Sequence, residues 1–551
     1  MDKQWFASQV LHARAMATGR HSMLKSFFSA AALASAVIAF SAPAAAQMER
    51  VPDRPAGEGE GPYDTLLIKD ATMIDGTGAP PEGPVSILVE GNRIARILRG
   101  GADIPADRVI DASGMYILPG FVDTHGHNGD PSKAPQPSYG FKLWLTHGVT
   151  SVRGVGFGFG PDDPSLDQKR RSAANTITAP RLFAYTVPGD VWPNGAVRTP
   201  QQGREWVRWI ANRGYDGIKF FNNEDPATLA AILDESDKLG LGTVAHLGQR
   251  GVAEVNARVA TELGLDGVTH FYGHFESLLD GAALPQYPAD YNYLDEQSRF
   301  AWVARLADQV GDPGTEQWSA YIDHLIENDA TLSPTFNIYS ASRDVMKARN
   351  MEWHEKYTLP SLMQFYAPSL TNHGSYYHDW TSEDEVAWRN FYRKWFDLTR
   401  EFKERGGRVT AGSDPGYIYQ TWGFAYIGEL EMLREAGLTP LEVIQAATIN
   451  GAREIYEPKG EEPPMGSIKE GKLADLVIVP ENPLANLKVL YGTGHTRLNR
   501  ETNTLETVGG VRWTIKDGIV FDARALLKDV ADMVEMQKLR ENAIMQSQQA
   551  E

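Results

Sequence analysis

The sequence predicts an α/β fold: a TIM (β/α)8 barrel with a small β-sandwich built from strands at both ends of the chain. Short apolar runs alternate with helical patterns through the middle of the 551 residues, as they do in parallel sheets with crossover helices. β patterns precede and follow this region. Because two short β stretches cannot each bury a core alone, we expect them to pair into one sandwich.

The N-terminal segment predicts export. Basic residues precede an apolar run at 27–40, and small residues at 42–46 follow it. We expect 1–46 to be a signal peptide, with Met23 as an alternative start, and the mature protein to be periplasmic or secreted. An uncleaved membrane anchor is the alternative; after cleavage we expect no stable membrane insertion.

Residues 47–62 are rich in Pro, Gly and Glu and are interpreted as a linker. The first part of the sandwich, 63–118, has strand patterns at 65–69, 85–90, 93–98, 108–111 and 115–118. Its second part, 465–525, has strand patterns at 475–479, 511–515 and 519–521. The pairs Gly91-Asn92 and Asp517-Gly518 mark tight hairpin turns, since Gly adopts a positive φ at no steric cost and Asn and Asp tolerate one.

Residues 119–464 form the predicted barrel domain. Its eight candidate strands are 121–123, 149–152, 181–185, 217–220, 242–245, 267–269, 331–333 and 408–411. Helical patterns at 226–233 and 440–447 begin with proline in the first turn, where its missing N–H has no cost. In such a barrel, functional residues lie at the C-terminal ends of the strands.

Two long insertions, at about 275–330 and 337–405, interrupt the barrel and are rich in large aromatic residues. These aromatics form either the core of a helical excursion or, because loops after barrel strands emerge on the active-site face, a lid or substrate pocket. A final helix at 526–551 is predicted from its apolar spacing and serves packing or oligomerisation. We expect a homo-oligomer.

Composition narrows the class of function. The formal net charge of -18 leaves no excess of Lys and Arg to neutralise phosphates, so we expect no nucleic-acid partner. The charge does not identify the substrate, which we expect to be a small molecule. The chain has no cysteine. Any metal must therefore be held by His, Asp, Glu or a modified side chain.

Potential metal ligands recur at the predicted strand ends. His125 and His127 are one residue apart, and the period of a strand points both side chains to one side. The other candidates are Lys219 in the fourth strand, His246 after the fifth, His270 after the sixth and Asp414 after the eighth. Each residue alone has an ordinary structural explanation, such as a hydrogen-bonded loop histidine or a turn-forming aspartate. Their shared placement at strand ends predicts a metal site.

The sequence resembles the amidohydrolase superfamily over roughly 63–525, in the branch that contains prolidase-like, imidazolonepropionase-like and ochratoxin-hydrolase-like enzymes. The motifs that carry the resemblance are Leu-Pro-Gly-Phe-Val-Asp-Thr-His at 118–125, Gly-Val-Thr-Ser-Val-Arg at 148–153, and Gly-Ser-Ile, Glu-Gly-Lys and Ala-Asp-Leu between 466 and 476. The resemblance implies a TIM barrel with one or two divalent metal ions, most often Zn²⁺.

The resemblance also implies roles for the candidate ligands. His125, His127 and Asp414 would hold the more buried ion, and His246 and His270 would hold the second. Lys219 would bridge both ions as a carbamate, which requires burial to lower its amine pKa from about 10.4. If Lys219 stays an ammonium, the alternative is a mononuclear site of His125, His127, His246 and Asp414, with His270 available for catalysis.

The expected activity is hydrolysis of amide bonds, in N-acyl amino acids or dipeptides with an apolar or prolyl part. A hydroxide bridging the two ions would attack, and Asp414 would act as general base and then acid. Arg153 is predicted either to bind a substrate carboxylate or to form a structural salt bridge. Tyr339 either contacts the oxyanion or only packs. The alternative functions are a cyclic-amide hydrolase or deaminase, and a non-catalytic binding protein on the same fold.

Overall fold

The structure is a computed structural model that describes residues 48–100, 102, 104–155, 164–221, 224–279, 285–369 and 373–550, the side chains of the last helix as far as 548. The predicted signal peptide lies outside these residues and stays a prediction. Every statement below concerns the described part of the chain. Its helices are all too short or too polar to cross a membrane.

The TIM barrel is confirmed. Its eight parallel strands are β6 (Phe121–Gly126), β7 (Val149–Gly154), β8 (Arg181–Thr186), β9 (Gly217–Phe220), β10 (Gly242–Ala245), β11 (Gly267–Thr269), β12 (Thr331–Ser333) and β13 (Arg408–Val409), paired in that order. Backbone hydrogen bonds from Thr124 N to Ala411 O and from Asp414 N to His125 O link the first strand to the segment that follows the last one. These bonds bring both ends of the curled sheet together.

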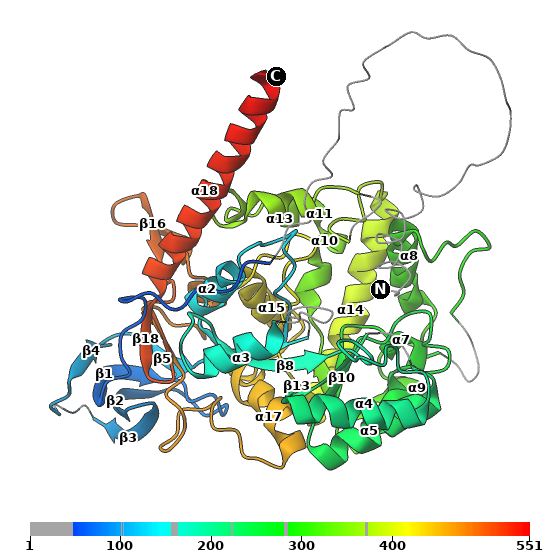
Figure 1. The fold of residues 1–551 in the computed structure, drawn as a ribbon, viewed down its shortest axis with the longest axis horizontal. Helices are drawn as coiled ribbons and strands as arrows, with labels where there is room; N and C mark the ends of the chain where they lie inside the picture. The colour runs from blue at the N-terminus through cyan, green and yellow to red at the C-terminus, as the bar shows by residue number, and fades with distance from the viewer. Residues whose placement is uncertain are drawn as a thin grey trace, which may run out of the picture. The chain divides into compact units, whose positions relative to one another are not determined.

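Helices cover the barrel strands (Figure 1). They are α2 (Ser138–Thr146), α3 (Ser165–Ala173), α4 (Pro200–Arg213), α5 (Pro226–Leu239), α6 (Ala257–Glu262), α9 (Glu316–Glu327), α14 (Ser382–Glu404), α15 (Phe424–Glu435), α16 (Pro440–Gln445) and α17 (Gly451–Tyr456), with a π-helical turn at Ala446–Asn450. Local sequence explains their bounds: the Asp225 carboxylate caps the first turn of α5, and Gly240 ends the helix with φ +66°. Thr439 and Glu442 form a capping box at α16.

Strands from both ends of the chain pair as expected. The N-terminal strands are β1 (Thr65–Met73), β2 (Glu82–Glu90), β3 (Arg93–Arg99), β4 (Arg108–Asp111) and β5 (Tyr116–Pro119); the C-terminal strands are β14 (Leu476–Val479), β17 (Trp513–Lys516) and β18 (Ile519–Asp522). β5 pairs antiparallel with β14, which joins the two halves in one eight-stranded sheet with its own apolar core. A hairpin of β15 (His495–Asn499) and β16 (Thr504–Val508) was not predicted.

The insertions are helical excursions. They contain α7 (His274–Ser277), α8 (Glu296–Val303), α10 (Ser340–Arg343), α11 (Val345–Arg349), α12 (His354–Tyr357) and α13 (Pro360–Phe365), with 3₁₀ turns η1 (Ala304–Asp308) and η2 (Phe336–Tyr339). Short 3₁₀ turns η4 (Glu457–Lys459) and η5 (Leu487–Leu490) lie nearer the C-terminus. Most aromatics of the insertions are buried, as in a helical core. The predicted C-terminal helix begins slightly earlier, as α18 (Ala523–Ala550), and its far half extends beyond the other elements of this unit (Figure 1).

Candidate metal centre

The structure brings the predicted ligands together at the C-terminal ends of the barrel strands. His125 lies in β6, Lys219 in β9, and His246 and His270 directly follow β10 and β11. Asp414 follows β13 and is 8% exposed. Because these strands are parallel neighbours in one barrel, their ends meet on the same face.

Asp414 lies at the middle of the histidine group. Its Oδ1 is 3.2 Å from His127 Nε2 and 3.7 Å from His125 Nε2, and its Oδ2 is 3.8 Å from His270 Nε2. When two ligand atoms each bind one tetrahedral ion at about 2.1 Å, the two ligand atoms lie roughly 3.4 Å from each other. Ligand atoms of His125, His270 and Asp414 all lie within 4.8 Å of one another, so the spacing fits ligands around a common ion.

The protonation states also fit a cation. Burial lowers the pKa of His125 and His246 well below the usual value, and that of His270 to about 3, so these rings are neutral at pH 7. The neighbouring His127 imidazole lowers the pKa of the Asp414 carboxyl to about 2, against the effect of burial. Neutral imidazoles and an ionised carboxylate are the forms that bind Zn²⁺-like ions.

Backbone strain fixes two of the ligands. His270 and Asp414 have φ of +67° and +47°, although neither is glycine. Such conformations cost of order 1–3 kcal/mol each and persist where the surroundings enforce them. Here His270 N donates to Ser333 O and Asp414 N to His125 O. The enforced backbone conformation therefore directs both side chains towards the centre.

Two buried residues, Asp123 and Thr335, hold the candidate ligands in position through hydrogen bonds. Asp123 accepts hydrogen bonds from the backbone N–H groups of His125 and Ser413, from the Ser413 hydroxyl and from Trp144 Nε1, and so joins β6 to the Asp414 loop. His270 Nδ1 lies 2.5 Å from Thr335 Oγ1, which donates to Pro334 O. The threonine hydroxyl must therefore accept from Nδ1–H, which leaves the lone pair of Nε2 free for a cation.

Lys219 and His246 lie beside this group. The Lys219 side chain is buried, its Nζ donates to Thr269 Oγ1 at 2.9 Å, and burial lowers its pKa well below the usual value. His246 and His270 have ring centroids 4.7 Å apart. Burial therefore favours the neutral form of the Lys219 amine.

Arg153 forms the structural salt bridge. It is fully buried; its Nη1 lies 2.7 Å from Glu454 Oε1, and its Nε donates to Thr124 O at 2.6 Å. The guanidinium therefore binds inside the barrel, and the substrate-carboxylate role expected as an alternative is not what the geometry shows.

Tyr339 lies close to the centre but donates its hydroxyl to Tyr272 OH at 3.2 Å. Tyr272 in turn stacks on His246, with centroids 4.2 Å apart. Sequence reasoning missed Tyr272. The available signal was its position two residues after His270, where continued extension would place both side chains on one side.

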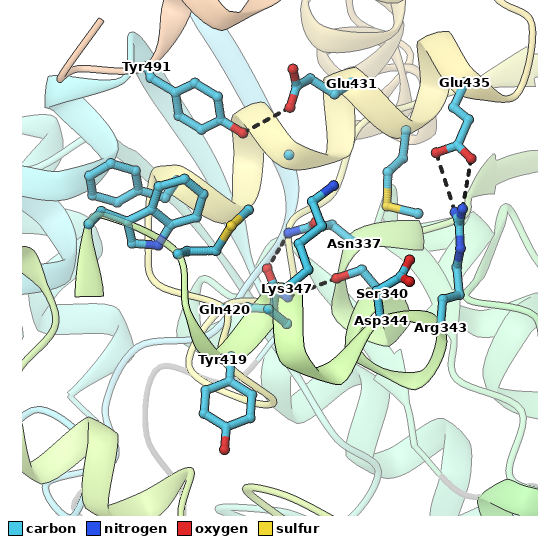
Figure 2. Close-up of a pocket in the computed structure, with 16 residues that line it drawn as sticks. Asn337, Ser340, Arg343, Asp344, Lys347, Tyr419, Gln420, Glu431, Glu435 and Tyr491 are labelled. Carbon is cyan, nitrogen blue, oxygen red and sulfur yellow. Dashed lines mark hydrogen bonds and ion pairs between the residues drawn. The ribbon is translucent and has the colours of Figure 1, made fainter. Parts of the chain in front are cut away.

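A cavity of about 130 Å³ lies away from the histidines, between α11, α15 and the loop after β13 (Figure 2). Figure 2 shows that Arg343 binds Glu435, Tyr491 binds Glu431 and Asn337 binds Gln420. These polar groups therefore already bind one another. The cavity therefore offers little reactive chemistry compared with the strand-end cluster.

The comparisons with known proteins agree with this geometry. Residues 382–520 match the model of the amidohydrolase family. The match covers about a quarter of the chain and includes Asp414 but none of the four histidines at the strand ends. Amidohydrolase-family proteins are generally metal-dependent, and the buried His125, His270 and Asp414 group is where this chain would hold a divalent cation.

The chain is similar to several family proteins. It is 40% identical over 210 residues to an N-acyl-D-glutamate deacylase of Alcaligenes xylosoxydans xylosoxydans, covering 37% of this chain and 40% of that protein. It is 28% identical over 216 residues to a dihydroorotase of Elusimicrobium minutum (strain Pei191), covering 37% and 47%. The chain thus spans about half the length of the relatives it matches.

Solved structures share the fold of this protein over a larger part of the chain. A Xaa-Pro dipeptidase with bound methionine has a TM-score of 0.55 at 20% identity, covering 83% of this chain and 100% of that one. The ochratoxinase of A. niger has a TM-score of 0.54 at 17% identity, covering 84% and 96%. At these identities the similarity shows the fold alone.

Proposed function

We propose that this protein is a metal-dependent hydrolase of amide C–N bonds. The observation that carries the proposal is the position of Asp414, whose two carboxylate oxygens lie 3.2–3.8 Å from the Nε2 atoms of His125, His127 and His270. The deacylases and dipeptidases among the similar proteins support the same class of reaction.

The chain's own residues supply the proton transfers. When bound, a divalent cation would polarise the scissile carbonyl and lower the pKa of water. Asp414 is ionised at pH 7, so it can take the proton from the attacking water as the new C–O bond forms. It then returns this proton to the leaving nitrogen as the C–N bond breaks. Tyr272, whose hydroxyl accepts a bond from Tyr339, keeps its own proton free to donate to the carbonyl oxygen.

We propose two divalent ions, most often Zn²⁺ in such sites, with Lys219 as a bridging carbamate. His125, His127 and Asp414 would hold one ion, and His246 and His270 the other. The support is the buried, neutral Lys219 amine, which lies close enough to His125, His246 and His270 to influence their pKa values. Metal analysis tests this: about two equivalents per chain are expected, and one equivalent together with an unmodified lysine mass would contradict it.

The substrate class is N-acyl amino acids or dipeptides with an apolar or prolyl part. The rings of Tyr272 and Tyr339 lie beside His270, and Phe271 packs against Tyr339, which favours an apolar substrate part. A hydrolysis screen of metal-loaded protein against N-acyl amino acids, dipeptides and cyclic amides tests the class. His125→Ala is the control and should lose metal and activity together; activity without the metal ligand would refute the site.

A cyclic-amide hydrolase is the second candidate, because several similar proteins are dihydroorotases. The same screen separates the two: cleavage of dihydroorotate or hydantoin without cleavage of N-acyl amino acids would favour it. Export through the N-terminal segment and a homo-oligomer also remain proposals. Exposed Met536, Leu539 and Ile544 on α18 support self-association, which light scattering of the wild-type chain tests.

A further inference from the structure

A buried lysine lies in the loop that follows the metal-ligand strand β6. Lys133 is 4% exposed, and its ammonium lies 3.2 Å above the ring centroid of Tyr417 and 4.6 Å from that of Phe365. Its backbone oxygen accepts a hydrogen bond from Ser361. The side chain is thus held in an aromatic cradle instead of extending into solvent.

The charge of Lys133 is only partly balanced. The nearest carboxylate oxygen, Asp130 Oδ2, lies 3.5 Å away on a side chain that is 44% exposed, and Asp130 Oδ1 is bound by Ser132. Burial lowers the pKa of Lys133 to about 8, while the charge of Asp130 opposes this shift. Lys133 thus has one ion-pair partner, and because that carboxylate is 3.5 Å away and partly exposed, the ammonium keeps N–H donors that a further anion could bind.

The cradle connects Lys133 to the metal centre. The Tyr417 ring that lies under the ammonium also contacts the edge of the His127 ring, with centroids 5.7 Å apart. His127 has the most exposed side chain of the three histidines around Asp414, at 17%, so it marks the open side of the centre. One tyrosine ring therefore separates the ammonium from the open side of the site.

We propose that Lys133 binds the free carboxylate of the substrate, and so makes the protein selective for acyl compounds that end in an amino acid. This inference rests on the proposed function. The Tyr417 ring centroid lies 3.2 Å from the Lys133 ammonium and 5.7 Å from the His127 ring centroid, so the ammonium is at most about 9 Å from His127, within the length of an N-acyl amino acid or a dipeptide. The other buried cation near the centre, Arg153, is already bound by Glu454 and Thr124.

If Lys133 were purely structural and only anchored its loop through Tyr417, its removal would have a different effect on ligand binding. Removing a structural lysine would change the affinity for all ligands equally, whereas removing a carboxylate-binding lysine would change the affinity only for ligands that carry a carboxylate. Comparing an acid with its carboxamide separates the two roles.

The test uses the metal-loaded full chain at pH 7 and two ligands that resist hydrolysis, N-benzenesulfonylglycine and its carboxamide, with binding measured by calorimetry. A charge-assisted hydrogen bond predicts that the acid binds about 10- to 100-fold more tightly than the amide. Lys133→Met should reduce this ratio to about one, Lys133→Arg should keep most of it, and Lys528→Met, on the exposed face of α18, should leave it unchanged.

An unchanged ratio in Lys133→Met, or no preference for the acid in the wild type, would overturn the inference. If Lys133→Met does not fold, as judged by circular dichroism, the wild-type ratio and Lys133→Arg still decide. Because binding is measured without turnover, a protein that prefers the acid but cleaves no amide would contradict the proposed function and leave this inference standing.

Discussion

Replacing Arg153 with methionine tests whether this residue is structural, as its contacts indicate. The substitution keeps an apolar side chain of similar length and removes the guanidinium that bonds Glu454 and Thr124 O. Both partners of the ion pair are at most 1% exposed, so solvent does not screen the interaction. Removing one member of a buried pair leaves the other charge uncompensated, and we expect a loss of about 3–5 kcal/mol in stability.

A second substitution sharpens this expectation. Glu454→Gln in the Arg153→Met background removes the uncompensated charge and keeps an oxygen for the bond from Thr410 Oγ1. The double variant should therefore be more stable than Arg153→Met alone.

The assay is the denaturant midpoint, followed by tryptophan fluorescence, together with the acid-to-carboxamide binding ratio. We expect the midpoint to fall in Arg153→Met and to recover partly in the double variant. The binding ratio of the protein that remains folded should stay at the wild-type value. An unchanged midpoint with a collapsed ratio would show that Arg153, and not Lys133, binds the carboxylate.

Three further outcomes are expected at the centre itself. Asp414→Asn should lower kcat by about 10²–10⁴-fold because it removes the proton acceptor, while metal analysis should still find bound ion; near-normal turnover would exclude the role. Thr335→Val should weaken metal affinity about 10–100-fold, measured by competition with a chelator, because His270 loses the partner that fixes its tautomer; equal affinity would disprove this support. The unfolding free energy of the metal-free protein should fall as pH drops from about 6.5 towards 3, because unfolded histidines bind protons in this range and folded His270, with a pKa of about 3, does not. His270→Gln should flatten that dependence in denaturant titrations, and an identical slope would contradict the assignment.

The barrel, and the placement of the candidate ligands at its strand ends, were predictable because both depend on local patterns. Each strand is a short apolar run, and parallel strands in a barrel all end on one face, so a polar residue after a run is placed without tertiary information. The β15–β16 hairpin was missed because its residues are largely exposed and polar, which leaves no alternation to detect.

Partners far apart in the chain were not predictable. Nothing local to Arg153 indicates that Glu454 will lie beneath it, and the choice between a salt bridge and a substrate contact needed the folded barrel. The same holds for Thr335, whose αL conformation turns its hydroxyl to His270. Lys133 has no sequence signal either, since its environment comes from Phe365 at the end of α13 and from Tyr417 in the loop after β13.

The metal centre also lies where the barrel closes. The ligands His125 and Asp414 belong to the first strand and to the loop after the last one, and the bond from Asp414 N to His125 O joins the same two residues. Asp123 ties these segments together a second time through Ser413. A cation bound by both side chains would add a third connection between the two ends of the sheet, and any ligand that binds only the folded state stabilises that state. Metal binding at this candidate site would therefore be coupled to barrel closure, because the atoms that would hold the ion are positioned by the hydrogen bonds that close the barrel.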